Sequence, residues 1–335
     1  MGHIVKGTSE ASFSGLRDLL GTHISKGDEG GYIDESGTRG WDKDTIVNVF
    51  STTKTITSLA ALILIDRGPI SPYEKVATYW PEFAVNGKQD IEIRHIISHT
   101  SGVPGWEQPV TLDDGCNFDK AVPAGLPAAL MDSGNCFWLS FFHPWLGVVD
   151  SDLHRVSDLI PWAAAPDSDS NIDADSIAAR VMSNPKFTPN MANTTMWRQA
   201  ELGTSNGHGN ARSIAKILST ISLGGSVDGK RLLKPATIDL IFQEMSNGID
   251  LVTSMPVRFG VGYGITGEGV VPTWLPNGRI CFWSGLGGSV AIMDLDRRMT
   301  IVIVMNKLYP VGLGSDLTIE YVKEIYRAVE VSGLE

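Results

Sequence analysis

The sequence predicts an α/β fold of the α+β kind, in which helices flank an antiparallel sheet that is interrupted by a mostly helical insertion. Three observations lead to this prediction: helix patterns near both ends, β-rich runs confined to the last third, and an irregular middle. Residues 1–70 and 205–335 are expected to form the α/β domain and residues 71–204 the insertion. A chain of 335 residues is long enough for a substantial core.

Two helices are predicted within the first 70 residues. The first rests on an apolar stripe made of Phe13, Leu16, Leu19 and Leu20. A Gly- and Asp-rich loop follows over residues 27–40, with room for a short strand around Tyr32. The second helix is predicted over residues 55–66, after an extended segment at residues 45–50, and Gly68 is its natural C-cap.

The middle of the chain gives weaker signals. A helix is predicted over residues 91–98, whereas residues 103–206 are rich in Pro, Asp and Ser, with short helical patches such as 175–182. Regular structure returns in a helix that ends at Gly224-Gly225. Its apolar stripe consists of Ala211, Ile214, Ala215 and Leu218.

The final third is expected to form the sheet. Its β-rich runs are residues 258–265, 279–283, 289–294 and 299–306. The polar turn at residues 294–298 predicts an antiparallel hairpin between the last two runs. A closing helix is expected to begin at the N-cap Ser315. Its core-facing residues are Leu317, Tyr321, Ile325 and Ala328.

The most informative stretch is Ser51-Thr52-Thr53-Lys54, at the head of the second helix. Its serine and lysine are three residues apart, on one face of the first helical turn. There the amine can take the hydroxyl proton, and the unpaired amides of the helix start favour the negative charge that follows. Because the amine must be neutral, we expect desolvation to lower its pKa. The alternative is an N-capping serine with a solvated lysine.

The composition argues against several functional classes. A net charge of −11 without a cluster of Lys and Arg argues against nucleic acid. The most apolar window, residues 137–149, is too short to span a bilayer, and the polar N-terminus does not resemble a signal peptide. Cys116, Cys136 and Cys281 form no disulfide framework, so a cytoplasmic location is expected. No metal or organic cofactor is expected, and the oligomeric state stays open.

Several motifs together resemble the serine β-lactamase and penicillin-binding protein superfamily, and more narrowly its class C-like esterases and transesterases. They are Phe50-Ser51-Thr52-Thr53-Lys54, Asp66-Arg67-Gly68, Tyr79-Trp80-Pro81-Glu82-Phe83, His99-Thr100-Ser101-Gly102, Asn206-Gly207-His208-Gly209-Asn210-Ala211-Arg212-Ser213, Phe259-Gly260-Val261-Gly262-Tyr263 and Trp283-Ser284-Gly285. They occur in the order expected for the family, over roughly residues 42–109 and 150–328. The resemblance implies a β-lactamase/transpeptidase-like fold, with Ser51 as nucleophile and Lys54 as general base.

The resemblance also implies roles for the last motif. Trp283-Ser284-Gly285 would lie on the strand that lines the site, and the backbone amides of Ser51 and Leu286 would form an oxyanion hole. β-Lactamases commonly have lysine or histidine where this chain has Trp283, so a cation that grips a substrate carboxylate is absent. Neutral small-molecule esters are therefore favoured. The alternative is that Trp283 only packs on the core.

Two features depart from the family pattern. The family's second motif begins with a tyrosine that shares proton transfer with the lysine, but this chain has no tyrosine from Trp80 through Gly262. Residues 121–149 read instead as a truncated or replaced segment. Tyr32 follows the first helix almost directly, so an edge or central strand is expected to be absent. A splice variant, a faulty gene model and a decayed copy remain open explanations.

Four side chains are candidates to replace the tyrosine: His99, His143, His208 and Tyr263. A structural role is the default for His99, His208 and Tyr263, and nothing in the sequence supports His143. Two hypotheses follow. In the first, the protein is a serine hydrolase or transesterase of small-molecule carboxylic esters that forms an acyl-enzyme at Ser51. Its activity would be impaired, since a lost acid–base partner costs about 10²–10⁴-fold in rate. In the second, it is an inactive paralogue that acts, if at all, as a binding protein.

Overall fold

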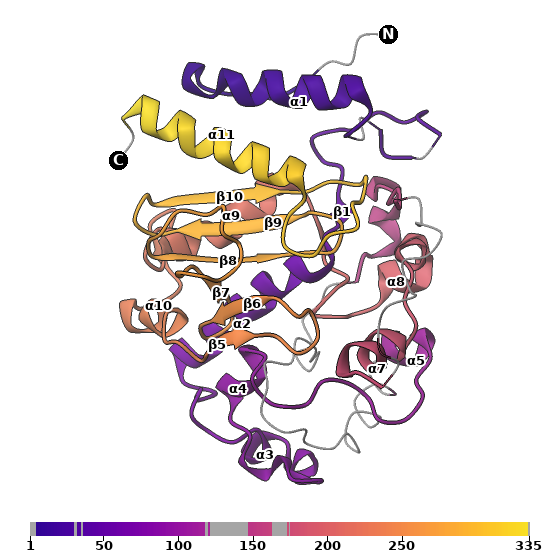
Figure 1. Ribbon diagram of the computed structural model, residues 1–335, viewed down its shortest axis with the longest axis vertical. Coiled ribbons are helices and arrows are strands. Elements are labelled where there is room, and N and C mark those ends of the chain that lie inside the picture. The colour runs from indigo at the N-terminus through magenta and orange to yellow at the C-terminus, as the bar shows by residue number, and fades with distance from the viewer. Residues whose placement is uncertain are drawn as a thin grey trace.

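The computed structural model describes residues 5–29, 32–34, 36–117, 120, 147–162, 173 and 175–333. A six-stranded antiparallel sheet forms its centre, with the strand order β10-β9-β8-β7-β6-β5 (Figure 1). The strands are β5 (Ser246–Ile249), β6 (Pro256–Phe259), β7 (Gly264–Ile265), β8 (Ile280–Ser284), β9 (Val290–Asp294) and β10 (Met299–Ile303). The predicted antiparallel sheet flanked by helices is confirmed, as is the hairpin between its last two strands.

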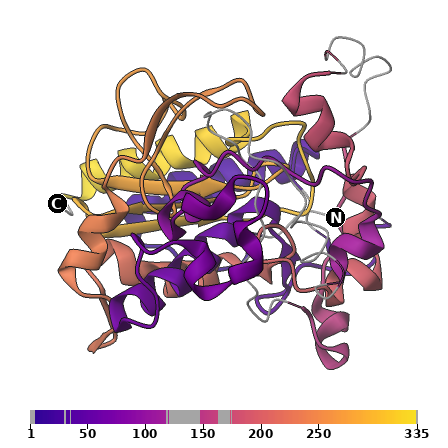
Figure 2. The same ribbon diagram turned by 90° about the horizontal axis from the view of Figure 1, so that it is seen from below.

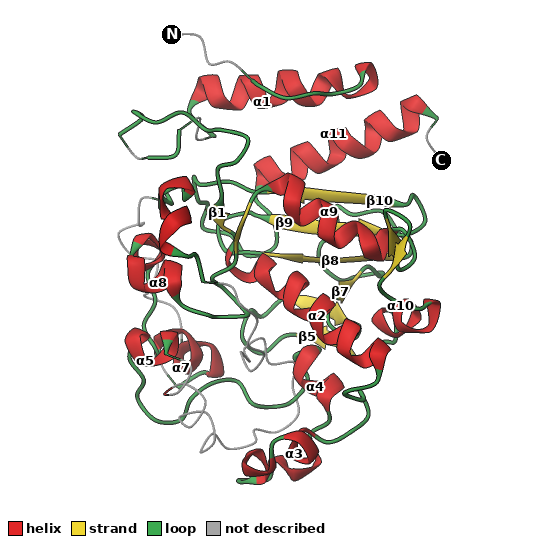
Figure 3. Ribbon diagram, turned by 180° about the vertical axis from the view of Figure 1, so that it is seen from behind, coloured by secondary structure: helices red, strands yellow, loops and turns green. Residues whose placement is uncertain are grey.

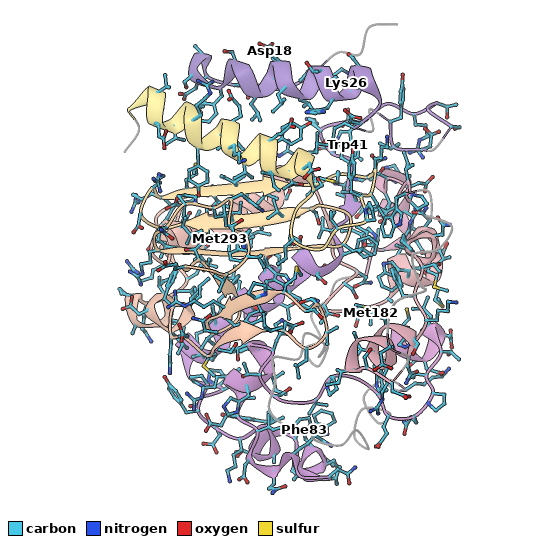
Figure 4. All side chains as sticks on the ribbon, viewed as in Figure 1. Asp18, Lys26, Trp41, Phe83, Met182 and Met293 are labelled. Atoms are coloured by element: carbon cyan, nitrogen blue, oxygen red, sulfur yellow. The ribbon has the colours of Figure 1, made fainter. Side chains whose placement is uncertain are left out.

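Helices cover both faces of this sheet because neighbouring residues of its strands point in opposite directions. Phe282 of β8 belongs to an apolar cluster with residues of α11 (Asp316–Ser332), which Figure 2 shows along one side of the sheet. Met293 of β9, labelled in Figure 4, belongs to the cluster on the other face. There α2 (Thr53–Arg67) and α9 (Ala211–Ser222) cross the sheet, as Figure 3 shows from behind.

The predicted closing helix begins as expected, because the Ser315 side chain accepts a hydrogen bond from the amide of Thr318. The predicted first helix is α1 (Ser14–Lys26), which ends at Gly27 with a φ of 76°. It packs against α11 and is the outermost helix in Figure 1.

The region after α1 contains little regular structure. Residues 27–29, 32–34 and 36–46 have two isolated bridges, Tyr32 with Gly40 and Ile46 with Val156, and no strand. Within the described part of the chain β10 is therefore an edge of the sheet. The absence of an early strand stays a prediction. The predicted replaced segment lies outside the described residues apart from residues 147–149, and so do Cys136 and His143.

Short elements fill the middle of the chain, as the sequence predicted. They are α3 (Val76–Tyr79), α4 (Ile93–Ile97), α5 (Leu112–Cys116), α7 (Ile177–Ser183) and α8 (Thr195–Gln199), with 3₁₀ turns at Pro81–Ala84, Lys88–Asp90, Asp150–Arg155 and Pro189–Asn193. A separate apolar cluster around Phe83, labelled in Figure 4, supports α3 and α4. The division into an α/β domain and an insertion at residues 71–204 stays a prediction.

One predicted strand was wrong in its extent. The run 258–265 forms two antiparallel strands, β6 and β7, because the chain turns at Gly260 and Gly262. A Cβ at Gly260 would lie 1.8 Å from the Ile241 carbonyl oxygen, and Gly262 has a φ of 89°. Both positions therefore need glycine.

Several short elements were not predicted. They are α10 (Pro235–Ile241), β5, and the two-stranded pairs β1 (Val47–Asn48) with β2 (His208–Gly209) and β3 (Ser226–Val227) with β4 (Lys230–Arg231). The β1–β2 pair matters most for the site, because it fixes the segment directly before Ser51.

Candidate active site

Ser51 lies in a 3₁₀ turn, Phe50–Thr52, directly before α2 and not in the α-helix itself. The turn is sharp because Phe50 adopts a φ of 43°, which is unusual for a bulky residue. The rings of Phe187 and Trp197 pack against Phe50, at 5.8 and 6.4 Å between centroids, and hold it there. Ser51 itself stays partly exposed, so a substrate can approach its hydroxyl.

The Lys54 amine contacts the Ser51 hydroxyl. Its Nζ donates to Ser51 Oγ at 2.8 Å and to the Thr204 carbonyl oxygen at 2.9 Å. Burial lowers the pKa of Lys54 to about 7, so a large fraction of the amine is neutral near neutral pH. The structure thus brings the two predicted side chains together. Burial desolvates the Lys54 amine, so the alternative of an N-capping serine with a solvated lysine does not apply.

The turn between β8 and β9 is pressed against the residues that precede Ser51. A Cβ at Gly285 would lie only 2.2 Å from the Val49 carbonyl oxygen. The Ser289 hydroxyl donates to that same carbonyl at 3.0 Å and lies 3.0 Å from the Thr52 hydroxyl. These contacts join the turn that carries Leu286 to the start of α2. The oxyanion hole of the Ser51 and Leu286 amides remains a prediction.

Trp283 and Ser284, also predicted at the site, are buried at the end of β8. The Trp283 ring stacks on the His99 ring at 5.7 Å and 21°, and both pack against Phe259. The Ser284 hydroxyl donates to the carbonyl of Gly312. Trp283 therefore belongs to a cluster of three rings with His99 and Phe259, called the aromatic wall below. Ser284 joins the end of β8 to the loop after β10 through its hydrogen bond.

The histidine of this wall is affected by the charge of Lys54. Burial, and then the charge of Lys54, lower the pKa of His99 to about 3. Its imidazole is therefore neutral at physiological pH, and its backbone adopts a φ of 60° in the turn after α4.

The sequence did not indicate the contribution of residues 203–209. Besides the Thr204 carbonyl, this segment contributes the Gly207 amide, which donates to Thr53 Oγ1 at 2.9 Å. The Asn48 side chain donates to the Ser205 carbonyl at 3.1 Å. The family-like motif that begins at Asn206 indicated that the region matters, but it did not indicate a contact with Lys54.

Two of the four tyrosine substitutes lie in structural positions. The Tyr263 hydroxyl is buried and donates to the Thr55 carbonyl at 2.7 Å, and burial raises its pKa well above the usual value. His208 pairs with Asn48 across β1 and β2, and burial lowers its pKa to about 4. His143 lies outside the described residues, and His99 is a candidate whose pKa is lowered in part by the charge of Lys54.

The part of the chain that the structure describes contains neither a cluster of metal ligands nor a helix that could span a membrane. There, His, Cys, Asp and Glu side chains nowhere gather in threes as a metal site would require. None of the described helices combines the length and apolar character needed to cross a bilayer.

Ser51 lies beside a desolvated lysine, at the start of a helix and next to the end of an antiparallel strand. This arrangement is typical of sites for acyl transfer. The chain belongs to the Beta-lactamase family, whose profile matches residues 14–132 and 139–321. The predicted family and β-lactamase/transpeptidase-like fold are therefore confirmed.

Individual relatives agree with this assignment. "Esterase/beta-lactamase LipL" of Mycobacterium tuberculosis is 25% identical and covers 83% of this chain and 73% of its own. The structure of a family VIII carboxylesterase superposes with a TM-score of 0.84 at 23% identity, covering 96% of this chain and 99% of its own. EstCE1, described as a hydrolase with promiscuous acyltransferase activity, has a TM-score of 0.66 at 17% identity, covering 94% and 98%.

Proposed function

We propose that this protein is a serine hydrolase or transesterase that acts on small-molecule carboxylic esters through an acyl-enzyme at Ser51. The 2.8 Å contact between Lys54 Nζ and Ser51 Oγ is the observation that carries the proposal. The descriptions of its relatives support the same chemistry, since LipL is named an esterase and EstCE1 a hydrolase with acyltransferase activity.

Acylation begins with neutral Lys54, which takes the hydroxyl proton as Ser51 Oγ bonds to the ester carbonyl carbon. The carbonyl oxygen gains the negative charge, and the amides of Ser51 and Leu286 are the proposed donors to it. When the intermediate collapses, the bond to the alcohol oxygen breaks. The protonated Lys54 returns its proton to that oxygen, and the acyl group stays on Ser51.

Deacylation repeats these steps with a new nucleophile. Lys54 takes a proton from water, giving hydrolysis, or from an alcohol, giving transesterification, and then returns it to Ser51 Oγ. Lys54 acts as both base and acid, because the hydroxyl of Tyr263 is committed to the Thr55 carbonyl. We therefore expect turnover to be slower than in an enzyme that has two proton-transfer groups.

The aromatic wall supports a neutral substrate. Trp283 and Phe259 are buried and pack against His99 at the end of β8, and the imidazole is uncharged, so these three residues bring no charge to the end of that strand. A substrate carboxylate would find no cation at position 283, and this favours a neutral ester. The proposal includes a cytoplasmic location, which the free thiols of Cys116 and Cys281 support.

Replacement of the nucleophile tests the proposal. The purified protein is incubated with para-nitrophenyl butyrate, nitrophenolate release is followed, and the intact mass is read for a butyryl adduct. We expect release and an adduct in the parent protein, and loss of both in Ser51→Ala. Ser25→Ala, on the exposed face of α1, is the matched control. Equal activity in Ser51→Ala and the control would overturn the proposal.

The second candidate function is that of a binding protein without turnover. The lack of any tyrosine from Trp80 through Gly262 favours it, because the family's second proton-transfer group is then missing. In that case the mass spectrum would show no adduct, and the release of nitrophenolate would not exceed that of Ser51→Ala. An adduct that forms but hydrolyses slowly would instead identify an impaired enzyme.

A further inference from the structure

The loop after β10 lies between the end of α1 and the β8–β9 turn. Its residues 306–312 contact both, although α1 and the turn are more than 250 residues apart in sequence. Figure 4 labels Lys26, the last residue of α1, near the start of α11, the helix into which this loop leads. Tyr309, half-buried within the loop, makes a contact in each direction.

On the side of the turn, the contacts are made by the backbone. The Tyr309 amide donates to the Gly287 carbonyl at 3.1 Å, and the Gly287 amide donates to the Val311 carbonyl at 3.3 Å. Gly287 has a φ of 90°, and a Cβ there would lie 2.4 Å from the Leu308 side chain. The residue that follows Leu286 is therefore fixed by this loop on both its amide and its carbonyl.

On the side of α1, the contacts are made by side chains. The Tyr309 hydroxyl donates to the Asp28 carbonyl, and the Lys307 amine donates to the Gly27 carbonyl. These carbonyls belong to the turn that ends α1, so the loop is anchored to the C-terminus of that helix. A cation near a helix C-terminus is also favoured by the helix dipole.

The end of α1 is in turn held by His23. Its Nδ1 lies 3.0 Å from the Asp28 carboxylate, and its Nε2 lies 3.0 Å from the Glu320 carboxylate of α11. Its ring packs edge-on against Tyr321 at 5.8 Å. Asp28 is thus held through its side chain by His23, and its carbonyl faces Tyr309 from a defined position.

We propose that Tyr309 is a positioning residue for the acyl transfer proposed above, and that it holds the Leu286 amide in place by joining the end of α1 to the Gly287 carbonyl. This inference rests on the proposed function, because it concerns the same oxyanion donor. The inference also gives α1 a role in the geometry of the site, although this helix lies outside the sheet and away from the start of α2. Oxyanion donors act only within a narrow range of distance, so a small displacement of the turn weakens them.

Tyr309→Phe tests the inference, because it removes the hydroxyl anchor and keeps the ring and the backbone contacts. We expect kcat for para-nitrophenyl butyrate to fall about 3- to 30-fold with KM within about twofold, less than the loss of a whole oxyanion donor. Tyr73→Phe is the matched control, because it removes an exposed tyrosine hydroxyl that donates to Gln243. Equal kcat in the two variants, with equal thermal stability, would refute the positioning role.

A second readout separates positioning from a general loss of folded protein. The same variants are assayed with the thiono analogue of the ester, whose sulfur is a poorer hydrogen-bond acceptor than oxygen. A displaced oxyanion donor should lower the preference for the oxygen ester in Tyr309→Phe, whereas a smaller folded fraction would leave that ratio unchanged. An unchanged ratio together with a lower kcat therefore counts against the inference.

Lys307→Met provides an independent variant, since it removes the other side-chain anchor of the same loop. We expect a decrease in kcat in the same direction and a larger one in the double variant with Tyr309→Phe. A double variant with parental kcat would contradict the inference. If Ser51→Ala retains full activity, the proposed function fails instead, and that outcome is distinct from a Tyr309→Phe variant that equals its control.

Discussion

The two sides of Ser51 are built from different kinds of structure. On one side lie the buried strands β8 and β9 and the long helix α2, where the turn of Gly285 meets the Val49 carbonyl directly. On the other side lie the short helices and turns of residues 71–204, from which the Thr204 carbonyl reaches Lys54 and His99 stacks on Trp283. Both the nucleophile and the base belong to the regular side.

This difference separates the proposed nucleophile and base from the place of the family's second proton-transfer group. The proposed nucleophile Ser51 and the proposed base Lys54 are positioned by α2 and the turn before it. The tyrosine that would share proton transfer with Lys54 in the family is missing from the other side, over residues 80–262. Changes on the regular side should therefore affect activity much more than changes on the insertion side.

The largest effect within this comparison is expected for Lys54→Met, which replaces the side chain by an unbranched one that is one heavy atom shorter and has no amine. We expect kcat/KM to fall about 10²–10⁴-fold, as is typical when a general base is removed. Lys43→Met, at an exposed lysine, is the control. Because burial disfavours the charged amine, Lys54→Met should also unfold at a higher temperature than the parent near pH 7. Retained activity would place the base elsewhere.

The pH profile of the parent follows from the same amine. Only neutral Lys54 accepts the proton, and its pKa is lowered to about 7. Below pH 7 we expect kcat/KM to fall about tenfold per pH unit, and above pH 7 to level off. A profile that is flat from pH 5 to pH 8 would exclude Lys54 as the base.

A smaller effect is expected for Gly285→Ala. The added Cβ would lie 2.2 Å from the Val49 carbonyl oxygen, so the turn must move away from the start of α2. We expect kcat to fall about 10- to 100-fold, with a loss of stability of about 1–3 kcal/mol. Gly248→Ala in β5, where a Cβ meets no atom within 4 Å, is the control. Parental kcat in Gly285→Ala would show that the turn does not set the geometry of the site.

The same comparison explains what the sequence could predict. The contact between Ser51 and Lys54 follows from helical spacing, so it could be predicted from four residues. The Thr204 carbonyl lies 150 residues away from Lys54, and no local pattern indicates it. The break between β6 and β7 depends on the Ile241 carbonyl beside Gly260, which is also a contact between distant segments. Local spacing thus predicted the contact between Ser51 and Lys54, whereas the other contacts of Lys54 could only be seen in the fold.

The smallest effect is expected on the insertion side, for His99→Phe. A phenyl ring can keep the stacking on Trp283, and the imidazole that it replaces is a poor acid and base because its pKa is lowered to about 3. We therefore expect kcat and KM to change less than about threefold, measured beside Lys54→Met on the same ester. A decrease of about 100-fold in a variant with parental stability would have the opposite meaning. It would show that His99 has taken over the proton transfer of the missing tyrosine, and the insertion side would then contribute directly to the chemistry.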